Sequence, residues 1–202
     1  MTPPCIWTFL SSLREYEYFV VLLENYEMAK SQIPMNTARR TLVVGYGNPY
    51  RRDDGVGRAV VDALRRELGQ PALDPLDDGF AELGREVDTV VAHQLVPEFA
   101  ELMGSYALAI FVDAHVGDGT EPLWAEPIAP IPHTTSVSHH LHPGTLLHLA
   151  QRIHGRAPRG VLISLRGHDF EFGDGLSAET ASLVPPAVAR IRALIEATGT
   201  DL

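Results

Sequence analysis

Hydrophobic residues follow two alternating patterns along most of this chain. Short apolar runs bounded by polar or glycine-rich stretches predict β-strands at residues 41–46, 88–92, 109–113, 123–128 and 160–166. Between these runs, apolar residues that recur every three or four positions predict helices at residues 55–68, 97–103, 143–154 and 187–198. Strands that alternate with helices predict a three-layer α/β/α sandwich with a mainly parallel, twisted sheet of about five strands.

Two segments depart from this alternation. Residues 1–38 precede the first predicted strand and are rich in aromatic side chains, with one amphipathic helix predicted over residues 12–30. Because Met35 lies just before that strand, we expect residues 1–38 to be an N-terminal extension or a start-site artefact, and residues 39–202 to form the single domain. Residues 69–84 are rich in Pro, Asp and Gly, which predicts a surface loop or a short irregular helix.

Composition narrows the function classes. The chain has 202 residues, 45% of them hydrophobic, which is enough to bury one core. A net charge of -10 argues against a sequence-independent nucleic-acid binder and favours a positively charged partner segment. Cys5 is the only cysteine, so neither a disulfide framework nor a thiolate zinc cluster is expected. With no membrane-spanning stretch and no signal peptide, we expect a cytoplasmic protein that does not bind membranes.

The first predicted strand runs into a glycine-rich turn that ends on two carboxylates. Residues 45–48 read Gly-Tyr-Gly-Asn, and Asp53 and Asp54 follow at the start of the next predicted helix. A dinucleotide-binding fingerprint would need glycine in place of Tyr50 and would bring a phosphate to the helix N-terminus, where this chain already carries negative charge. One interpretation is that an aspartate simply caps the helix; the other is that Asp54 belongs to a functional site.

Further polar side chains follow the other predicted strands. Because the carboxyl ends of parallel strands meet at one edge of a sheet, we expect these side chains to converge there. The candidates are Asn48, Asp53, Asp54, His93, Gln94, Glu98, Asp113, His139 and His140. Imidazole and carboxylate together suit a borderline divalent ion such as nickel or zinc. Each candidate also has a local explanation: Glu98 as a helix-start charge, Asp113 as a turn residue, and the histidine-rich stretch 133–142 as a solvated polar run.

The motif over residues 45–57, Gly-x-Gly-Asn followed by Asp-Asp-Gly-x-Gly, resembles the opening motif of the nickel-iron hydrogenase maturation endopeptidases. Those enzymes trim the C-terminus of the hydrogenase large subunit. The resemblance covers about residues 41–198, and residues 164–177 are similar to the late segment of a subgroup associated with soluble hydrogenases. The family's metal-contacting positions match Asp54, Glu98 and His140 of this sequence, with His139 as a neighbouring candidate.

This resemblance implies that nickel already held by the large-subunit precursor is bridged by Asp54, Glu98 and His140, which positions the scissile peptide. Nickel would then come with the substrate, because one imidazole and two carboxylates form an incomplete shell that binds free metal weakly. We expect the remaining candidates to line the surrounding substrate-binding loops; these are Asn48, Asp53, His93, Gln94, Asp113 and His139.

Some features depart from the family pattern. Residues 92–95 read Ala-His-Gln-Leu where many members carry an Asp-x-Gly-Thr type of turn. Arg51 and Arg52 stand where apolar residues are usual, and they either contact a peptide substrate or are solvated loop charges. The sequence has neither a His-Glu-x-x-His zinc motif nor a Gly-x-Ser-x-Gly nucleophile turn, which argues against a conventional protease.

Two other function classes remain open. One is a metal-binding assembly chaperone that uses the same pocket to hold the large subunit without cutting it. The other is a phosphatase or hydrolase that uses Asp53 or Asp54 as nucleophile together with magnesium. The histidine-rich stretch disfavours the second alternative, because magnesium prefers oxygen ligands.

Overall fold

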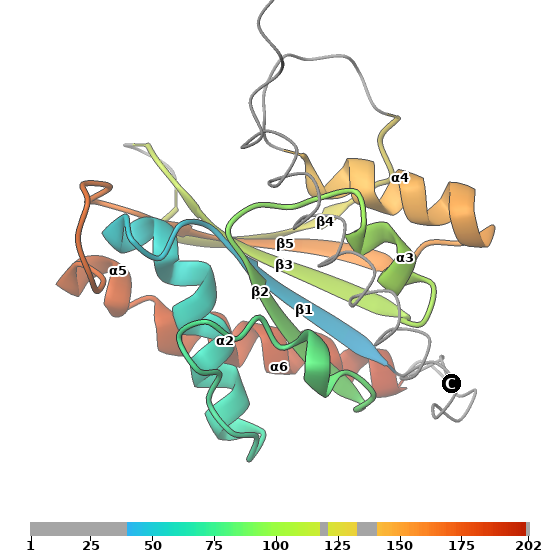
Figure 1. The fold of residues 1–202 in the computed structure, drawn as a ribbon, viewed down its shortest axis with the longest axis horizontal. Helices are drawn as coiled ribbons and strands as arrows, with labels where there is room; N and C mark the ends of the chain where they lie inside the picture. The colour runs from blue at the N-terminus through green and yellow to red at the C-terminus, as the bar shows by residue number, and fades with distance from the viewer. Residues whose placement is uncertain (1–39, 118–120, 133–140, 201–202) are drawn as a thin grey trace, which may run out of the picture.

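The computed structural model describes residues 40–117, 121–132 and 141–200, so the predicted N-terminal helix over residues 12–30 lies outside the described residues (Figure 1). The sheet has the strand order β2-β1-β3-β5-β4. Its strands are β1 (Thr41–Tyr46), β2 (Val87–Ala92), β3 (Leu108–His115), β4 (Leu123–Ile128) and β5 (Arg159–Arg166). Neighbouring strands from β2 to β5 are parallel, and β4 runs antiparallel to β5 at the edge, which confirms the mainly parallel sheet predicted from the sequence.

Helices cover both faces of this sheet (Figure 1). The helical segments are η1 (Arg52–Gly55), α2 (Val56–Glu67), η2 (Phe80–Glu82), α3 (Phe99–Met103), α4 (Pro143–His154), α5 (Ala178–Ala181) and α6 (Val184–Thr200). Helices α2 and α6 lie on one face, and α3 and α4 on the other, which confirms the three-layer sandwich. No helix in the described ranges combines the length and apolar character that crossing a bilayer requires.

The core consists of two apolar layers separated by the sheet. Successive residues of a strand point to opposite faces, so Ile110 and Val112 of β3 pack with the α2 and α6 layer. Ala109 and Phe111 of the same strand pack with the α3 and α4 layer. Because both faces of the central strands are buried, β1 and β3 consist largely of apolar residues, which is why the sequence revealed them.

The observed helices and strands mostly differ from the predicted ones by a few residues at their ends. Helix α3 begins at Phe99 rather than at residue 97, and α6 begins at Val184 rather than at residue 187. The prolines that follow Val184 are compatible with a first helical turn, because the N–H groups there lack intrahelical partners in any case. The short helices η1, η2 and α5 were not predicted separately.

A pair of glycines brings α2 into close contact with the first strand. A Cβ atom on Gly57 would lie 2.6 Å from the Tyr46 carbonyl oxygen and 2.7 Å from that of Val112. On Gly45, a Cβ atom would lie 2.3 Å from the Gly57 carbonyl oxygen. Both positions therefore exclude any larger residue at this helix distance. This close contact fixes the distance between the sheet and the start of α2, and with it the position of the preceding loop.

The segment predicted as a loop or short irregular helix, residues 69–84, covers the outer edge of β2 and contains η2. The Val91 N–H donates to the Asp78 carbonyl oxygen at 2.9 Å, and Gln70 Nε2 donates to the Val87 carbonyl oxygen at 3.2 Å. These bonds occupy part of an edge that would otherwise expose unpaired strand groups.

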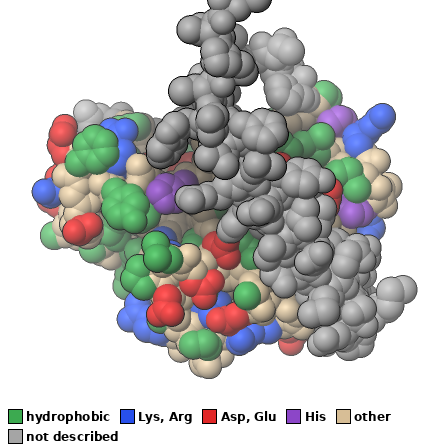
Figure 2. All heavy atoms as spheres, in the orientation of Figure 1, with side chains coloured by type: hydrophobic (Ala, Val, Ile, Leu, Met, Phe, Trp, Pro, Cys, Tyr) green, Lys and Arg blue, Asp and Glu red, His purple; other side chains and the backbone are tan. Residues whose placement is uncertain are grey.

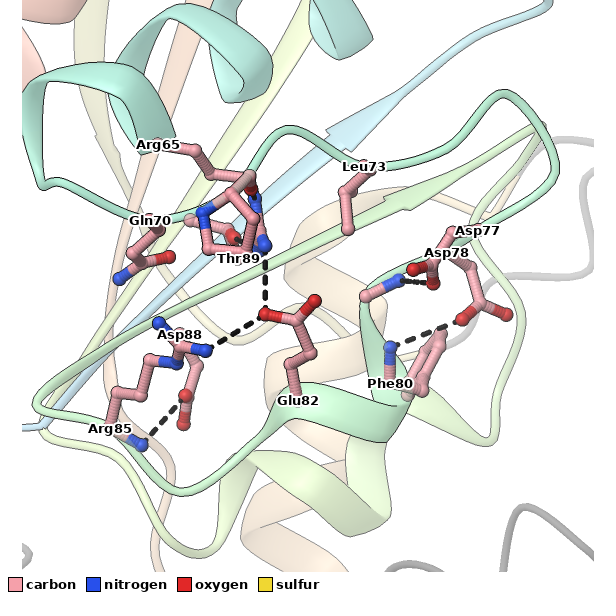
Figure 3. A network of polar contacts seen from close by, with 12 residues as sticks. Arg65, Gln70, Leu73, Asp77, Asp78, Phe80, Glu82, Arg85, Asp88 and Thr89 are labelled. Atoms are coloured by element: carbon pink, nitrogen blue, oxygen red, sulfur yellow. Dashed lines mark hydrogen bonds and ion pairs between the residues drawn. The ribbon is translucent and has the colours of Figure 1, made fainter.

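A buried arginine of α2 attaches this segment to the rest of the domain (Figure 3). Arg65 of α2 is 1% exposed, and its guanidinium donates to the Pro71 carbonyl oxygen, the Thr89 hydroxyl and the Glu82 carboxylate at 2.6, 2.8 and 2.8 Å. Glu82 also accepts from Arg85 at 2.9 Å. A planar guanidinium suits this role because its donors point in several fixed directions at once.

Candidate functional site

The loop that follows β1 positions the Asp54 carboxylate. Gly47 has a φ of 126°, and a Cβ atom there would lie 2.0 Å from the Asp54 carbonyl oxygen, so only glycine fits this turn. The Asn48 N–H donates to Asp54 Oδ2 at 2.9 Å. This bond holds the carboxylate over the end of β1, and Asp54 stays partly exposed. Asn48 thus supports Asp54 through its backbone, while its own side chain accepts from the Tyr50 N–H.

Asp53 has a structural role, and its prediction as a substrate-binding residue is therefore corrected. The residue is fully buried. Its carboxylate accepts five hydrogen bonds at 2.7 to 2.9 Å, all from a late part of the chain. The donors are the N–H groups of His168, Asp169 and Ser177 and the hydroxyls of Ser177 and Thr180. A carboxylate enclosed in this way can neither contact a substrate nor act as a nucleophile, so that part of the phosphatase alternative is wrong.

The hydrogen bonds keep Asp53 ionised although it is buried. Burial on its own would raise the pKa of the carboxyl group, but the bonds from His168, Ser177 and Asp169 lower the pKa from its usual 3.8 to about 2. A buried charge surrounded by donors is therefore present across the physiological pH range.

The helix-cap interpretation of the two aspartates is also wrong. Asp53 and Asp54 lie in the short helix η1, and the N-cap residue of α2 is Gly55, where no side chain caps the helix. Instead, the Asp53 carboxylate accepts hydrogen bonds from residues far along the chain, and the Asp54 carboxylate accepts one from the Asn48 N–H. The local capping rule failed here because tertiary partners compete for the same oxygen atoms.

The two arginines before Asp53 attach the same late segment to the first loop. Arg52 pairs with Asp169 at 3.0 Å, and the Arg51 Nε donates to the Phe170 carbonyl oxygen at 3.0 Å. The Arg51 guanidinium also lies over the Phe172 ring, 5.6 Å from its centroid. These contacts are with the chain itself, so the arginines join the loop after β1 to the loop after β5.

The second loop leaves the sheet beside the first. The register pairs Tyr46 with Ala92, and the Gly47 N–H donates to the Ala92 carbonyl oxygen at 3.1 Å. The following residues His93, Gln94 and Glu98 are exposed. Glu98 directly precedes α3, and its side chain makes no capping hydrogen bond there. The loops that carry Asp54 and Glu98 therefore begin next to each other. The sequence predicted this, because carboxyl ends of neighbouring parallel strands lie at the same edge of the sheet.

Two adjoining cavities open between the second loop and the segment that covers β2. The larger has a volume of about 310 Å³ and the smaller about 160 Å³, and they share Leu76, Asp78, Val91, Ala92 and His93. Together we call them the β2 groove. The larger cavity is also lined by Phe80, Gln94, Val96, Glu98 and Phe99, and the smaller by Gly47, Pro49, Tyr50, Arg58, Pro75 and Asp77.

Asp113 lies in β3 and is paired with Tyr46. The strand continues to His115, so Asp113 does not end it as the sequence suggested. Burial raises the pKa of the Tyr46 phenol, and the nearby Asp113 charge and its hydrogen bond raise it further. The phenol thus stays protonated and donates to Asp113, which links the ends of β1 and β3 below the first loop.

The histidine-rich stretch is only partly described. His139 and His140 lie outside the described residues, whereas His142 is the N-cap of α4 and its Nδ1 accepts from the Gly144 N–H at 3.0 Å. Within residues 40–117, 121–132 and 141–200, no group of three His, Cys, Asp or Glu side chains could hold a metal ion. The predicted trio of Asp54, Glu98 and His140 includes a residue beyond those ranges and remains a prediction.

No protein family model and no curated protein sequence matches this chain. Its fold does match solved structures. The hydrogenase maturating endopeptidase HybD from E. coli aligns with a TM-score of 0.57 and 22% identity, covering 79% of this chain and 94% of that one. A solution structure of an endopeptidase from Escherichia coli gives 0.59 and 22% over the same shares. The [NiFe] hydrogenase maturation protease HycI from Thermococcus kodakarensis KOD1 gives 0.54 and 18%, covering 78% and 93%.

This chain has the fold of the hydrogenase maturation endopeptidases. The match confirms the fold that the sequence resemblance implied. It spans nearly the whole of each maturation endopeptidase while leaving about a fifth of this chain unmatched. The identities of 18 to 22% are low, in keeping with the finding that no family model and no curated protein sequence matches.

Sequence reasoning missed the wall of the site that residues 69–84 provide. A signal for this segment was present in the sequence. Residues 74–79 read Asp-Pro-Leu-Asp-Asp-Gly, which places an apolar side chain between acidic ones in a stretch that favours turns. Ser177 and Thr180, which hold Asp53, gave no local sign of that role.

Proposed function

We propose that this protein is an endopeptidase that removes the C-terminal extension of a nickel-loaded hydrogenase large-subunit precursor. The proposal depends on one observation: the loops that carry Asp54 and Glu98 begin next to each other, after Tyr46 and Ala92, which are paired in adjacent parallel strands. The fold shared with maturation endopeptidases supports the same reaction class. The β2 groove beside Glu98 offers room for a peptide segment.

In the mechanism that we infer, the precursor brings its own nickel ion, and Asp54, Glu98 and His140 complete the ion's ligand shell. Carboxylate and imidazole donors suit nickel, and too few of them are present for tight binding of free metal. The enzyme would thus bind only a precursor that has already received its metal. The bound ion would position the scissile peptide, and it would either polarise the carbonyl or activate a water for hydrolysis, or serve only as the feature by which the loaded precursor is recognised.

The buried charge of Asp53 and its donors keep η1 rigid, so Asp54 approaches the ion without rearrangement. A ligand held in place before binding loses little conformational freedom when the complex forms. Asp53 is therefore a positioning residue, and Asp54 is the residue that would touch the metal.

The test is incubation of the full chain with nickel-loaded and nickel-free precursor, followed by mass spectrometry of the large subunit. We expect loss of a C-terminal peptide from the nickel-loaded form alone. Asp54→Asn, Glu98→Gln and His140→Ala should each reduce the rate by at least about 10- to 100-fold, the loss that removal of even an outer partner of a metal ligand typically causes. Glu126→Gln, which changes an exposed carboxylate of β4 at the opposite edge of the sheet, is the matched control, and His139→Ala tests the neighbouring candidate imidazole.

Two results would overturn the proposal. Unchanged precursor mass together with a stable complex would indicate the assembly chaperone instead. Phosphate release from a surrogate ester, without tail removal, would indicate a hydrolase that uses Asp54. Undiminished tail removal by His140→Ala would refute the metal role of that histidine.

A further inference from the structure

Arg166 ends β5 and is a half-buried arginine without an acidic partner among the described residues. In those residues, the arginines that are buried or half-buried are Arg40, Arg58, Arg65 and Arg166. The first three each have an Asp or Glu oxygen within 3.8 Å of a guanidinium nitrogen. For Arg166, no ion pair and no side-chain hydrogen bond occurs within residues 40–117, 121–132 and 141–200, and its Nε is buried without a partner.

The missing partner does not reflect a shortage of acidic groups. The chain carries 26 Asp and Glu residues against 16 Lys and Arg, and Figure 2 shows acidic side chains gathered beside basic ones on one face. Asp113 lies on the same face of the sheet as Arg166, but its carboxylate binds the Tyr46 phenol. Partial removal of water from a charge costs free energy unless a partner replaces the water. A half-buried cation that is left unpaired in an acidic protein therefore indicates a ligand-binding role.

The backbone of Arg166 is held from two sides, so its side chain has a fixed origin. Its N–H donates to the Pro122 carbonyl oxygen at 2.8 Å, and its carbonyl oxygen accepts from the Thr180 hydroxyl at 2.9 Å. Although Nε is buried, the two terminal nitrogens of the guanidinium, which also bond to no described residue, are not buried. These terminal nitrogens therefore reach solvent, and they are the donors that a ligand can contact.

His115 and Trp124 lie beside this guanidinium. His115 is the register partner of Arg166 in β3, and its Nδ1 lies 2.9 Å from the Ser164 hydroxyl oxygen. The Trp124 ring of β4 lies next to the imidazole, with ring centroids 5.7 Å apart. Burial lowers the pKa of the His115 imidazole and the Arg166 charge lowers it further, so the ring is neutral at pH 7. The Arg166 cluster, which consists of Arg166, His115 and Trp124, thus offers one positive charge beside an aromatic surface.

We propose that the Arg166 cluster binds an organic carboxylate, with both carboxylate oxygens at the terminal nitrogens of Arg166 and the carbon skeleton against Trp124. A planar guanidinium matches the two oxygens of a carboxylate, and such charge-assisted pairs are stronger than neutral hydrogen bonds. The aromatic neighbour favours an anion that carries apolar carbon over inorganic phosphate. The carboxylate belongs either to a free small molecule or to an Asp or Glu side chain of a protein. The site is independent of the proposed cleavage, because Arg166 and His115 are assigned no part in it.

Nuclear magnetic resonance of the isotope-labelled full chain tests the site directly. Propionate, an end-blocked alanine-glutamate-alanine peptide and inorganic phosphate are titrated separately in a chloride buffer at pH 7 and constant ionic strength. The Nε–H signal of Arg166 and the ring signals of His115 are followed. We expect saturable shifts with a Kd of about 1 to 10 mM for a carboxylate, as one charge-assisted pair allows.

The three ligands separate the sources of the carboxylate. Tighter binding of propionate supports a free small molecule, and tighter binding of the peptide supports an acidic side chain of a protein. Phosphate that binds as tightly as both carboxylates would overturn the proposal, as would the lack of a saturable shift with either carboxylate.

Variants assign the binding to the Arg166 cluster, with the His115 ring signals as the readout. Arg166→Gln should weaken carboxylate binding at least about ten-fold, because it removes the charged donors. Arg190→Gln is the matched control, since it removes an exposed arginine from α6, and an equal effect there would overturn the proposal. If Arg166→Gln does not fold, Arg166→Lys decides, because lysine keeps the charge but lacks the planar fork. Carboxylate binding by Arg166→Lys as tight as that of wild type would overturn the proposal.

Thermal unfolding gives a second readout. A ligand that binds only the folded chain stabilises it in proportion to the logarithm of its concentration above Kd. At a propionate concentration about ten-fold above Kd, the Tm of wild type and of Arg190→Gln should rise by about 3 to 6 °C. The Tm of Arg166→Gln should stay unchanged, and an equal rise in that variant would overturn the proposal.

Discussion

Replacing Asp53 by asparagine tests whether a buried charge holds the candidate site together. The change keeps the size of the side chain but removes its charge and turns one oxygen into an NH2 donor. Oδ2 accepts from His168, Asp169, Ser177 and Thr180, whereas Oδ1 accepts from the Ser177 N–H. The best placement of the amide puts its oxygen at the Oδ2 position, so its NH2 group then faces the Ser177 N–H.

The expected cost follows from these contacts. The pKa of Asp53 falls from 3.8 to about 2 on folding, which corresponds to about 2 kcal/mol of stability at neutral pH. This value already includes the loss of the Ser177 N–H bond, which is one of the causes of the lowered pKa. Asp53→Asn should therefore lower the free energy of unfolding by about 2 kcal/mol, a substantial part of the roughly 5 to 15 kcal/mol of a typical domain.

Urea unfolding followed by circular dichroism at pH 7 measures this difference, and the same titration at lower pH tests its origin. Because the pKa is lowered by folding, the contribution is complete above about pH 4 and is lost as the pH falls towards 2. The gap between wild type and Asp53→Asn should narrow across that interval. Asp54→Asn is the control, since its amide oxygen can still accept from Asn48; it should change stability by less than about 1 kcal/mol.

The reasoning is refuted if Asp53→Asn unfolds within about 0.5 kcal/mol of wild type at pH 7, which is the range of an ordinary surface substitution. A gap that stays constant from pH 5 to pH 2 would leave the destabilisation real but would remove the buried charge as its cause.

Two further predictions concern the supports of the site. Gly57→Ala should push α2 away from the sheet, because its Cβ atom would lie 2.6 Å from the Tyr46 carbonyl oxygen; we expect thermal unfolding to show a loss of about 1 to 3 kcal/mol in stability. The control Gly69→Ala meets no atom within 4 Å, although Gly69 has a φ of 67°, and it should cost less. Equal losses of stability in the two variants would contradict the packing argument. Arg65→Met should speed hydrogen exchange at the amides of residues 69–84 and lower stability by about 1 to 3 kcal/mol. Arg66→Met, at the exposed neighbouring position, should do neither, and matching exchange rates in the two variants would contradict the role of Arg65.

The sequence predicted those features that depend on local periodicity. The buried strands are continuous apolar runs, so their number, order along the chain and approximate bounds could be read directly. Helix α4 was placed with its observed bounds because proline opens it and Gly155 follows it in the left-handed conformation. Since strands in such folds are mainly parallel, the meeting of the first and second loops could also be foreseen.

Features that depend on distant partners could not be predicted in this way. Asp53 and Asp54 are adjacent and chemically identical, and only the donors between His168 and Thr180 make one of them structural. Arg65 is one of three arginines on the amphipathic helix α2, and an arginine on such a helix is usually solvated. Its burial becomes evident only when residues 69–84 fold over it.

The bonds between Asp53 and the region up to Thr180 also have a consequence for biogenesis. The two residues are 127 positions apart, so the Asp53 carboxylate has no donors until most of the chain has been synthesised. At a translation rate of roughly 5 to 20 residues per second, that interval lasts about 6 to 25 s. During this period the first loop lacks the hydrogen bonds that hold Asp53, so we expect the candidate site to reach its final geometry only late in synthesis.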